Sequence, residues 1–160
     1  MSSPLRLSTD LKEFVKSLSS HEVEFLLVGA HAVAYHGRAR FTEDLDLFIR
    51  RSQANEEKLI KALLEFGFPV DAGQIRWFFE SPRAIKKLGV KPNLIELLNF
   101  LDGLDFDAAC LRGEPAKIGE ASVSVISLSD LLINKAAVGR PQDLADIHLL
   151  RQINNLDSSG

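Results

Sequence analysis

The sequence predicts an α+β domain, with a mixed sheet of about four or five short strands and helices mainly on one side of it. Short runs rich in branched and aromatic residues, such as residues 23–28 and 93–100, are typical of buried strands. Between such runs lie stretches with apolar residues at helical spacing, several of which end at a glycine. The 160 residues, of which 46% are hydrophobic, suffice for one domain with a buried core.

The first helix is expected within residues 1–20, where Ser8, Thr9 and Asp10 offer an N-cap before an apolar helical face. Val23 to Val28 is the first predicted strand, and Gly29 closes it with a tight turn. A short helix over Ala30 to Tyr35 should follow and end at Gly37. The free backbone amides at the start of that helix form a place where a phosphate can bind.

The second predicted strand, Phe41 to Ile49, carries two acids. Because side chains alternate along a strand, Asp44 and Asp46 share one face, about 7 Å apart, while Leu45 and Leu47 point into the core. Two carboxylates on one face repel each other unless a cation lies between them, and oxygen ligands suit magnesium. The alternative without a ligand is that both acids lie on the solvent-facing edge of a half-polar strand. The nearby Gly29 turn favours a site that holds a metal and a triphosphate together.

The middle of the chain should add a covering helix, which ends before Gly67, and a strand near Ile75 to Phe79. Asn93 to Phe100 is the next predicted strand, in which Glu96 is a lone acid among apolar residues. A buried charge needs a partner, so Glu96 is interpreted as a third metal ligand, with a structural arginine pair as the alternative. If Glu96 is not the third ligand, the remaining candidates are Asp71, Asp102 and Asp105.

The last third of the chain predicts a hairpin around Gly119 and then two helices. Ser127 or Ser129 caps the first helix, which runs to Gly139, and Pro141 suits the first turn of the second. The segment 154–160, NNLDSSG, has the composition of a disordered tail. No repeat, linker or second domain is visible, so residues 1–160 are taken as one domain.

Composition excludes several classes of protein. The net charge of −3 argues against a general nucleic-acid binder, which needs a basic surface. A single cysteine, Cys110, forms no internal disulfide, and no Cys and His residues have zinc-ligand spacing. Without a long apolar run or a signal peptide, the expected location is cytoplasmic, away from membranes.

Three segments together carry a resemblance: VGAHAVAYHGRARFTEDLDLFI, LIELLNF and VISLSDLLINKAAVGRPQDLADIHLL. They resemble the nucleotidyltransferase superfamily, with its polymerase-beta-like fold. They are most similar to its small bacterial and archaeal branch, which is related to the abortive-infection type IV toxin-antitoxin proteins. The likeness spans Phe25 to Leu150. Ala30 stands where the family has a second Gly or Ser, and Glu96 stands where Asp is usual.

The resemblance implies a metal-dependent transfer of a nucleoside monophosphate from a nucleoside triphosphate to an acceptor hydroxyl. Two magnesium ions, with manganese as the alternative metal, would be held by Asp44, Asp46 and Glu96. The acceptor would be an RNA, a protein or a small molecule. The competing hypothesis is an inactive partner module, or an antitoxin-like domain that binds another protein, because fold alone does not prove chemistry.

Several residues are candidates for holding the nucleotide, each with a structural alternative. The Gly29 turn, with Ala30 and His31, would receive the phosphates, although His31 could instead cap its own helix. Arg38 and Arg40 are interpreted as phosphate contacts or as solvated loop charges, and Thr42 is a weaker case of the same kind.

Basic residues later in the chain have a similar ambiguity. Lys135 points at the nucleotide phosphates in the resembled family, but it could simply interact with the helix dipole. Near it, Asp143 is explained by the dipole, and Asp146 by pairing with Arg140 or Lys135, so both acids are interpreted as orienting groups. The basic stretch from Arg83 to Lys91 is expected to be a solvated face, with contact to an acceptor RNA as the alternative.

Overall fold

The computed structural model describes residues 8–37, 42 and 44–156, which form six strands and seven helices. The strands are β1 (Phe25–Val28), β2 (Asp44–Ile49), β3 (Ile85–Leu88), β4 (Leu94–Leu98), β5 (Glu114–Ile118) and β6 (Ala121–Val125). The helices are α1 (Thr9–Ser20), α2 (Gly29–His36), α3 (Gln53–Phe66), α4 (Ala72–Glu80), α5 (Phe106–Leu111), α6 (Leu128–Val138) and α7 (Pro141–Ile153). The predicted α+β class is confirmed, although the sheet has six strands instead of four or five.

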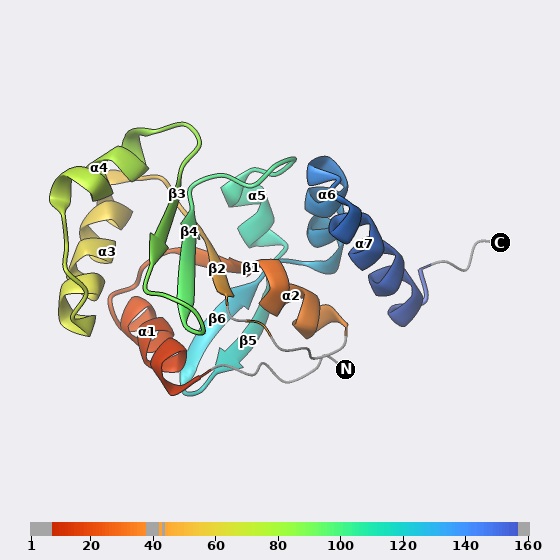
Figure 1. The fold of residues 1–160 in the computed structure, drawn as a ribbon, viewed down its shortest axis with the longest axis horizontal. Helices are drawn as coiled ribbons and strands as arrows, with labels where there is room; N and C mark the ends of the chain where they lie inside the picture. The colour runs from red at the N-terminus through yellow and green to blue at the C-terminus, as the bar shows by residue number, and fades with distance from the viewer. Residues whose placement is uncertain (1–7, 38–41, 43, 157–160) are drawn as a thin grey trace.

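The strands form one mixed sheet in the order β3-β4-β2-β1-β6-β5 (Figure 1). Strand β2 lies antiparallel to β1 and parallel to β4, while β1 lies parallel to β6. The two outer strands, β3 and β5, run antiparallel to their neighbours. The beginning of β2, the beginning of β4 and the end of β1 therefore meet at one edge of the sheet, which is the edge where α2 starts.

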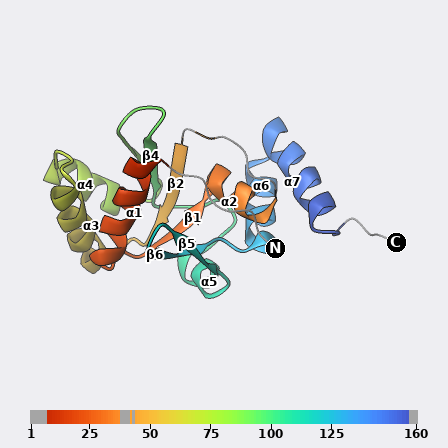
Figure 2. The same cartoon turned by 90° about the horizontal axis from the view of Figure 1, so that it is seen from below.

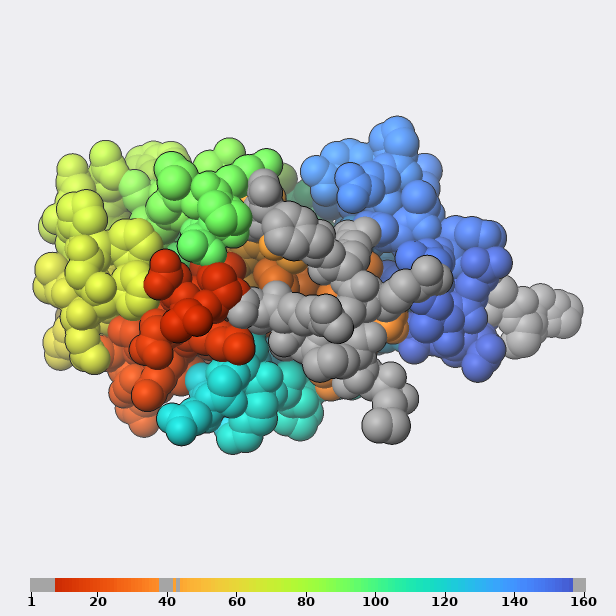
Figure 3. Space-filling model, turned by 60° about the horizontal axis from the view of Figure 1, so that its bottom comes forward, coloured from red at the N-terminus to blue at the C-terminus, as the bar shows by residue number. Residues whose placement is uncertain are grey.

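Helices α1 and α3 pack together beside the sheet, and their contact is aromatic. The ring of Phe14 in α1 meets Phe66 and Phe68 edge to face, at centroid distances of 5.4 and 5.7 Å. Helix α5 lies apart from this group (Figure 2). The ring of its Phe106 packs on Phe48 of β2. Helices α6 and α7 form a pair on the opposite side of the molecule from α3 and α4 (Figure 3).

The predicted strand near Ile75 to Phe79 is wrong, because these residues lie in helix α4. The side chain of Asp71 caps this helix by accepting a hydrogen bond from the Gln74 amide at 3.1 Å. Ile75, Phe78 and Phe79 are buried on the same helix, at the i, i+3, i+4 spacing of an amphipathic helix. Strand β3, inside the basic stretch, and the short helix α5 were not predicted from the sequence.

The other predicted elements are present with small shifts at their ends. Ser8 caps α1, Gly67 and Gly139 end α3 and α6 in the left-handed conformation, and Ser127 caps α6. Of the segment 154–160, the Asn154 side chain donates to the His36 carbonyl at 2.9 Å, and residues 157–160 lie outside the described part. None of the helices described is both long and apolar enough to cross a membrane.

Candidate functional site

Strands β2 and β4 bring the three predicted acids to one edge of the sheet. In the parallel β2–β4 ladder Asp46 lies directly beside Glu96, and Asp44 lies beside Leu94. Because alternate residues share a face, Asp44, Asp46 and Glu96 all project from the same face of the sheet. Leu45 and Leu47 point the other way and are fully buried in the core. The predicted placement of these three acids on one face is therefore confirmed, whereas their role as metal ligands stays a prediction.

The Asp46 carboxylate lies directly against the backbone of Gly29. A Cβ atom built on Gly29 would be 2.0 Å from Asp46 Oδ2, far inside van der Waals contact. Gly29 also has a φ of +69°, a conformation that side chains disfavour. Two separate constraints thus require glycine here, and together they place the first turn of α2 on the acidic strand.

Asp46 has the most perturbed acid group of the site. Burial raises its pKa, and so do a hydrogen bond with Glu96 and the negative charges of Glu96 and Asp44. The positive charge of Lys135 acts in the opposite direction, and the net result is a pKa of about 8. Such a carboxyl group binds a proton near neutral pH unless a cation takes the place of that proton.

Two carboxylate oxygens of the site are buried without a hydrogen-bond partner in the described part of the molecule, namely Oδ1 of Asp44 and Oδ1 of Asp46. Buried oxygens with free lone pairs are the donors that magnesium prefers, so the residues fit this metal in kind. Among the described residues, however, no three His, Cys, Asp or Glu side chains lie close enough together to hold a metal ion as they stand. The three acids therefore lie next to one another, but their carboxylates do not converge on one metal position.

Glu96 interacts with the side chains of Asp46 and Lys87. It hydrogen-bonds with Asp46, and its Oε1 lies 3.8 Å from the ammonium group of Lys87, which faces it from β3. The Lys87 side chain is 66% exposed, so this ion pair is weak and easily exchanged. The alternative third ligands are engaged elsewhere: Asp71 and Asp105 cap α4 and α5, and Asp102 pairs with Arg83 at 2.7 Å.

His31 lies in the first turn of α2 and is 2% exposed. It does not cap its helix, because the N-cap residue is Val28 and no side chain supplies a capping hydrogen bond. Within the described residues its Nε2 atom has no hydrogen-bond partner. Burial lowers the pKa of the imidazole and the Asp44 carboxylate raises it, with burial dominant, so the ring is neutral at pH 7.

Thr42 contacts the backbone of the acidic strand, and its role in phosphate binding stays a prediction. The Thr42 hydroxyl accepts a hydrogen bond from the Asp44 amide at 3.2 Å and lies 3.3 Å from the Asp44 carbonyl, to which it donates. Thr42 therefore fixes the backbone at the start of β2. Arg38 and Arg40, the predicted phosphate contacts, lie outside the described residues.

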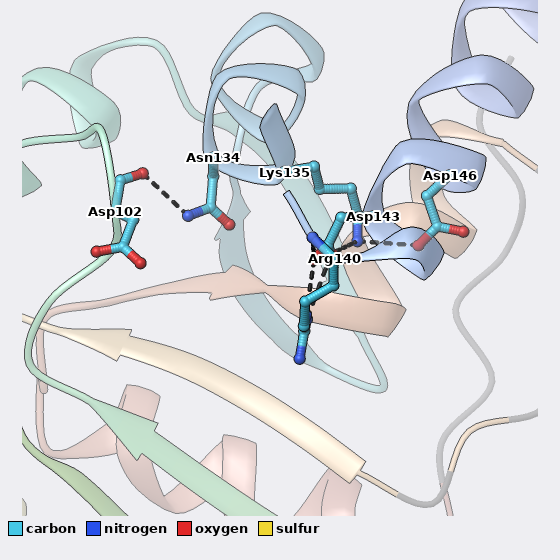
Figure 4. A network of polar contacts seen from close by, with 6 residues as sticks. All are labelled: Asp102, Asn134, Lys135, Arg140, Asp143 and Asp146. Carbon is cyan, nitrogen blue, oxygen red and sulfur yellow. Dashed lines mark hydrogen bonds and ion pairs between the residues drawn. The ribbon is translucent and has the colours of Figure 1, made fainter. Parts of the chain in front are cut away.

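Lys135 belongs to a buried network of charges between α6 and α7 (Figure 4). Its ammonium group lies 3.2 Å from Asp143 Oδ1 and 2.9 Å from Asp146 Oδ2. Arg140 reaches the same Asp143 at 2.7 Å and also donates its backbone amide to it. Hydrogen bonds from Arg140, and then from Lys135, lower the pKa of Asp143 to about 2, although burial opposes them.

This network corrects one interpretation of the sequence and confirms another. Asp143 is not explained by the helix dipole alone, since it binds two cations directly. The predicted pairing of Asp146 with Lys135 is confirmed. Lys135 also lies close enough to Asp46 to affect its pKa, so the network stands next to the acidic site.

On the other side of the network, Asn134 donates to the carbonyl of Asp102 at 3.0 Å and ties α6 to the loop before α5 (Figure 4).

Comparison with known proteins decides the family. Residues 7–159 match the family described as "Nucleotidyl transferase of unknown function (DUF2204)". The chain belongs to this family. No curated protein matches the sequence. Among solved structures, the fold of this nucleotidyl transferase family member is similar to that of an antigenic nucleotidyltransferase-like protein from Paracoccidioides brasiliensis. The two chains share 19% identity, with a TM-score of 0.51 over 91% of this chain and 78% of the other.

Sequence reasoning missed one residue of the site, Lys87. The basic stretch was visible in the sequence, but only the antiparallel pairing of β3 with β4 shows that Lys87 lies opposite Glu96. In this nucleotidyl transferase family member, the acidic patch of Asp44, Asp46 and Glu96 is therefore bordered by two lysines. Lys135 is buried and held by two acids, whereas Lys87 is exposed and bound loosely.

Proposed function

We propose that this protein transfers a nucleoside monophosphate from a nucleoside triphosphate to an acceptor hydroxyl in a metal-dependent reaction. One observation carries the proposal: the carboxylates of Asp44 and Asp46 hold buried oxygens without partners directly beside the first turn of α2. Carboxylates favour a cation and a helix N-terminus favours phosphate, so the two features suit one ligand that contains both. A magnesium–triphosphate complex is such a ligand.

Each residue would have a distinct task. Asp44 and Asp46 would hold magnesium, or manganese in its place, and Glu96 would complete the ligand set after leaving Asp46 and Lys87. The backbone amides from Gly29 onward would receive the phosphates, and the absence of a side chain at Gly29 leaves the turn in contact with Asp46. Lys135, fixed by Asp143 and Asp146, would supply a positive charge beside them without moving.

The chemistry of transfer follows from these positions. Bound magnesium would neutralise the charge that develops on the leaving pyrophosphate. Glu96, which lies on the side of the patch nearest the open edge strand β3, would accept the proton of the acceptor hydroxyl. Asp46 lies between Glu96 and the α2 turn, so it would align the attacked phosphorus with the acceptor. A cytoplasmic location, where triphosphates are abundant, is part of the proposal.

The test uses each of the four nucleoside triphosphates, labelled at the α-phosphate, with magnesium and fractionated cell extract. We expect label to appear in one fraction, which identifies the acceptor as RNA, protein or small molecule. Incorporation should need magnesium and should be lost in Asp46→Asn. If no triphosphate transfers label, and magnesium with triphosphate does not raise the Tm, the proposal is wrong and a protein-binding module becomes the better hypothesis.

A further inference from the structure

His31 is a buried polar side chain whose outer nitrogen has nothing to bind in the described structure. Its side chain is almost completely inaccessible, and no hydrogen-bond partner of Nε2 is found among the described residues. Most buried polar atoms in proteins have a partner, because an unmet hydrogen bond is costly. An exception at this position therefore indicates that a ligand supplies the missing partner.

The surroundings of His31 define that ligand. Oδ1 of Asp44 and Oδ1 of Asp46 are buried without partners as well, and Asp44 lies close enough to act electrostatically on His31. The carboxylate oxygens accept, so they need a cation or a donor, whereas an N–H at Nε2 needs an acceptor. Magnesium prefers oxygen ligands, so a metal ion held by the two carboxylates would not by itself satisfy the His31 nitrogen.

The position of His31 in its helix narrows the choice of ligand further. Side chains on an α-helix tilt toward its N-terminus, and His31 is the third residue of α2. The ring therefore leans toward the Gly29 turn, where the first amides of the helix attract an anion. A phosphate oxygen in that position would accept from the imidazole, while the metal on the same phosphate would bind the carboxylates.

We propose that His31 donates a hydrogen bond from Nε2 to a phosphate oxygen of the bound metal–triphosphate complex. This inference rests on the proposed function and adds a coupling residue to it. The histidine serves the phosphate and not the metal, so it makes triphosphate bind more tightly once the metal is present. It also carries a stability cost in the ligand-free protein, which is removed when the complex binds.

The substitution His31→Leu separates these two effects. It fills a similar space without a polar atom, so the ligand-free protein should have a Tm about 2–4 °C higher than that of the wild type. Its affinity for magnesium–tripolyphosphate, the probe without base or sugar, should fall about tenfold or more. Its affinity for manganese alone should stay within about twofold, because the imidazole does not bind the metal.

Two further variants make the experiment specific. In His31→Gln the side-chain amide nitrogen can take the place of Nε2 as a donor, so affinity for magnesium–tripolyphosphate should return to within about threefold of the wild type. His36 is the matched control, since it is in the same helix and its Nε2 is hydrogen-bonded to the Ile126 carbonyl at 2.6 Å. We expect His36→Leu to lower the Tm and to leave the affinity for magnesium–tripolyphosphate unchanged.

The outcomes distinguish the inference from the function on which it rests. If the wild type and His31→Leu bind magnesium–tripolyphosphate equally well, the inference is wrong and the proposed function stands. A lower Tm or loss of folding in His31→Leu would also overturn it, because the histidine would then be a structural residue. If the wild type binds neither magnesium–tripolyphosphate nor magnesium–ATP, both proposals fail.

Discussion

Two groups of acids lie close together in this molecule, and they are held in opposite ways. Asp143 and Asp146, between α6 and α7, are buried against Lys135, and Arg140 adds a second cation to Asp143 (Figure 4). Asp44 and Asp46, on β2, have buried oxygens without a hydrogen-bond partner in the described structure. The pKa of Asp143 is lowered to about 2, whereas the pKa of Asp46 is raised to about 8.

The contrast separates acids that stabilise the fold from acids that are kept for a ligand. A carboxylate that is more acidic in the folded state than in the unfolded state contributes stability at neutral pH. A carboxyl group whose pKa is raised by burial and repulsion lowers stability there, and such groups are concentrated at functional sites. Asp143 therefore stabilises the packing of α6 and α7, whereas Asp46 lowers the stability of the ligand-free protein at neutral pH.

The largest effect on stability is expected at Gly29. Gly29→Ala places a methyl group 2.0 Å from Asp46 Oδ2, in a backbone conformation that already disfavours side chains. We expect a loss of about 3–5 kcal/mol in the free energy of unfolding, measured by urea denaturation. Gly139 is the control, because it also has a φ of +69° but its nearest neighbour would be at an ordinary 3.5 Å. Gly139→Ala should cost only about 1–2 kcal/mol. Equal losses would show that Asp46 does not constrain the turn.

Glu96 should affect transfer more than binding. Glu96→Gln keeps the size of the side chain but removes the group that accepts the proton of the acceptor. We expect the transfer rate to fall by roughly 100-fold, with triphosphate affinity within a few-fold of the wild type. The rate is measured by single-turnover labelling and the affinity by calorimetry. An unchanged rate would remove Glu96 from the site.

The next effect in size is expected on stability, at the paired acids Asp143 and Asp146. Asp143→Asn leaves Lys135 with Asp146 and removes the partner of Arg140, so we expect a loss of about 2 kcal/mol at pH 7. Asp10 in the first turn of α1 is exposed, and Asp10→Asn should change stability by less than about 0.5 kcal/mol. A neutral Asp143→Asn would contradict the stabilising role of the network.

The same acid predicts how stability depends on pH. The Asp143 pKa is about 2 in the folded protein and has a reference value of 3.8, so the unfolded chain takes up protons first as the pH falls. The contribution of Asp143 is complete above about pH 5 and is lost progressively as the pH falls toward 2. Urea denaturation at pH 6, 4 and 3 should show this loss in the wild type and a smaller one in Asp143→Asn. Parallel curves for the two proteins would contradict the assignment.

The smallest effect is expected at Lys87. Its ion pair with Glu96 is exposed and 3.8 Å long, so Lys87→Ala should change the free energy of unfolding by less than about 0.5 kcal/mol. Because Glu96 loses a competing partner, affinity for magnesium should rise slightly rather than fall, as measured by calorimetry. A large loss of stability would show that Lys87 and Glu96 form a structural pair instead.

Local rules predicted most of this fold from the sequence. The alternation of Asp44, Leu45 and Asp46, and the glycines that end α3 and α6, depend only on neighbouring residues. Helix α4 was mistaken for a strand because its buried aromatic pair, Phe78 and Phe79, is adjacent in the sequence and suits either element. The hydrogen bond that the Gln74 amide donates to the Asp71 side chain caps this segment as a helix.

The missing parts of the site depend on contacts between distant segments. The contact of Gly29 with Asp46 needs the antiparallel register of β1 and β2, in which Val28 lies beside Asp46. The sequence explains Asp143 by the helix dipole, whereas its contact with Lys135, eight residues earlier, depends on how α6 and α7 pack. The spacing of residues along the chain predicts which of them lie near a strand or the end of a helix. It does not predict which of them contact one another in the folded protein.

The central claim is that Asp46 is kept for a ligand at the expense of the fold, and the Tm of Asp46→Asn tests it most directly. At pH 7 and without ligand, removing the raised carboxyl pKa should give Asp46→Asn a Tm about 2–4 °C above that of the wild type. With magnesium and ATP at a hundredfold excess over Kd, the wild type should gain roughly 5–10 °C and the variant almost nothing, so that the order reverses. A lower Tm for ligand-free Asp46→Asn, with the same gain on adding magnesium and ATP, would contradict the claim.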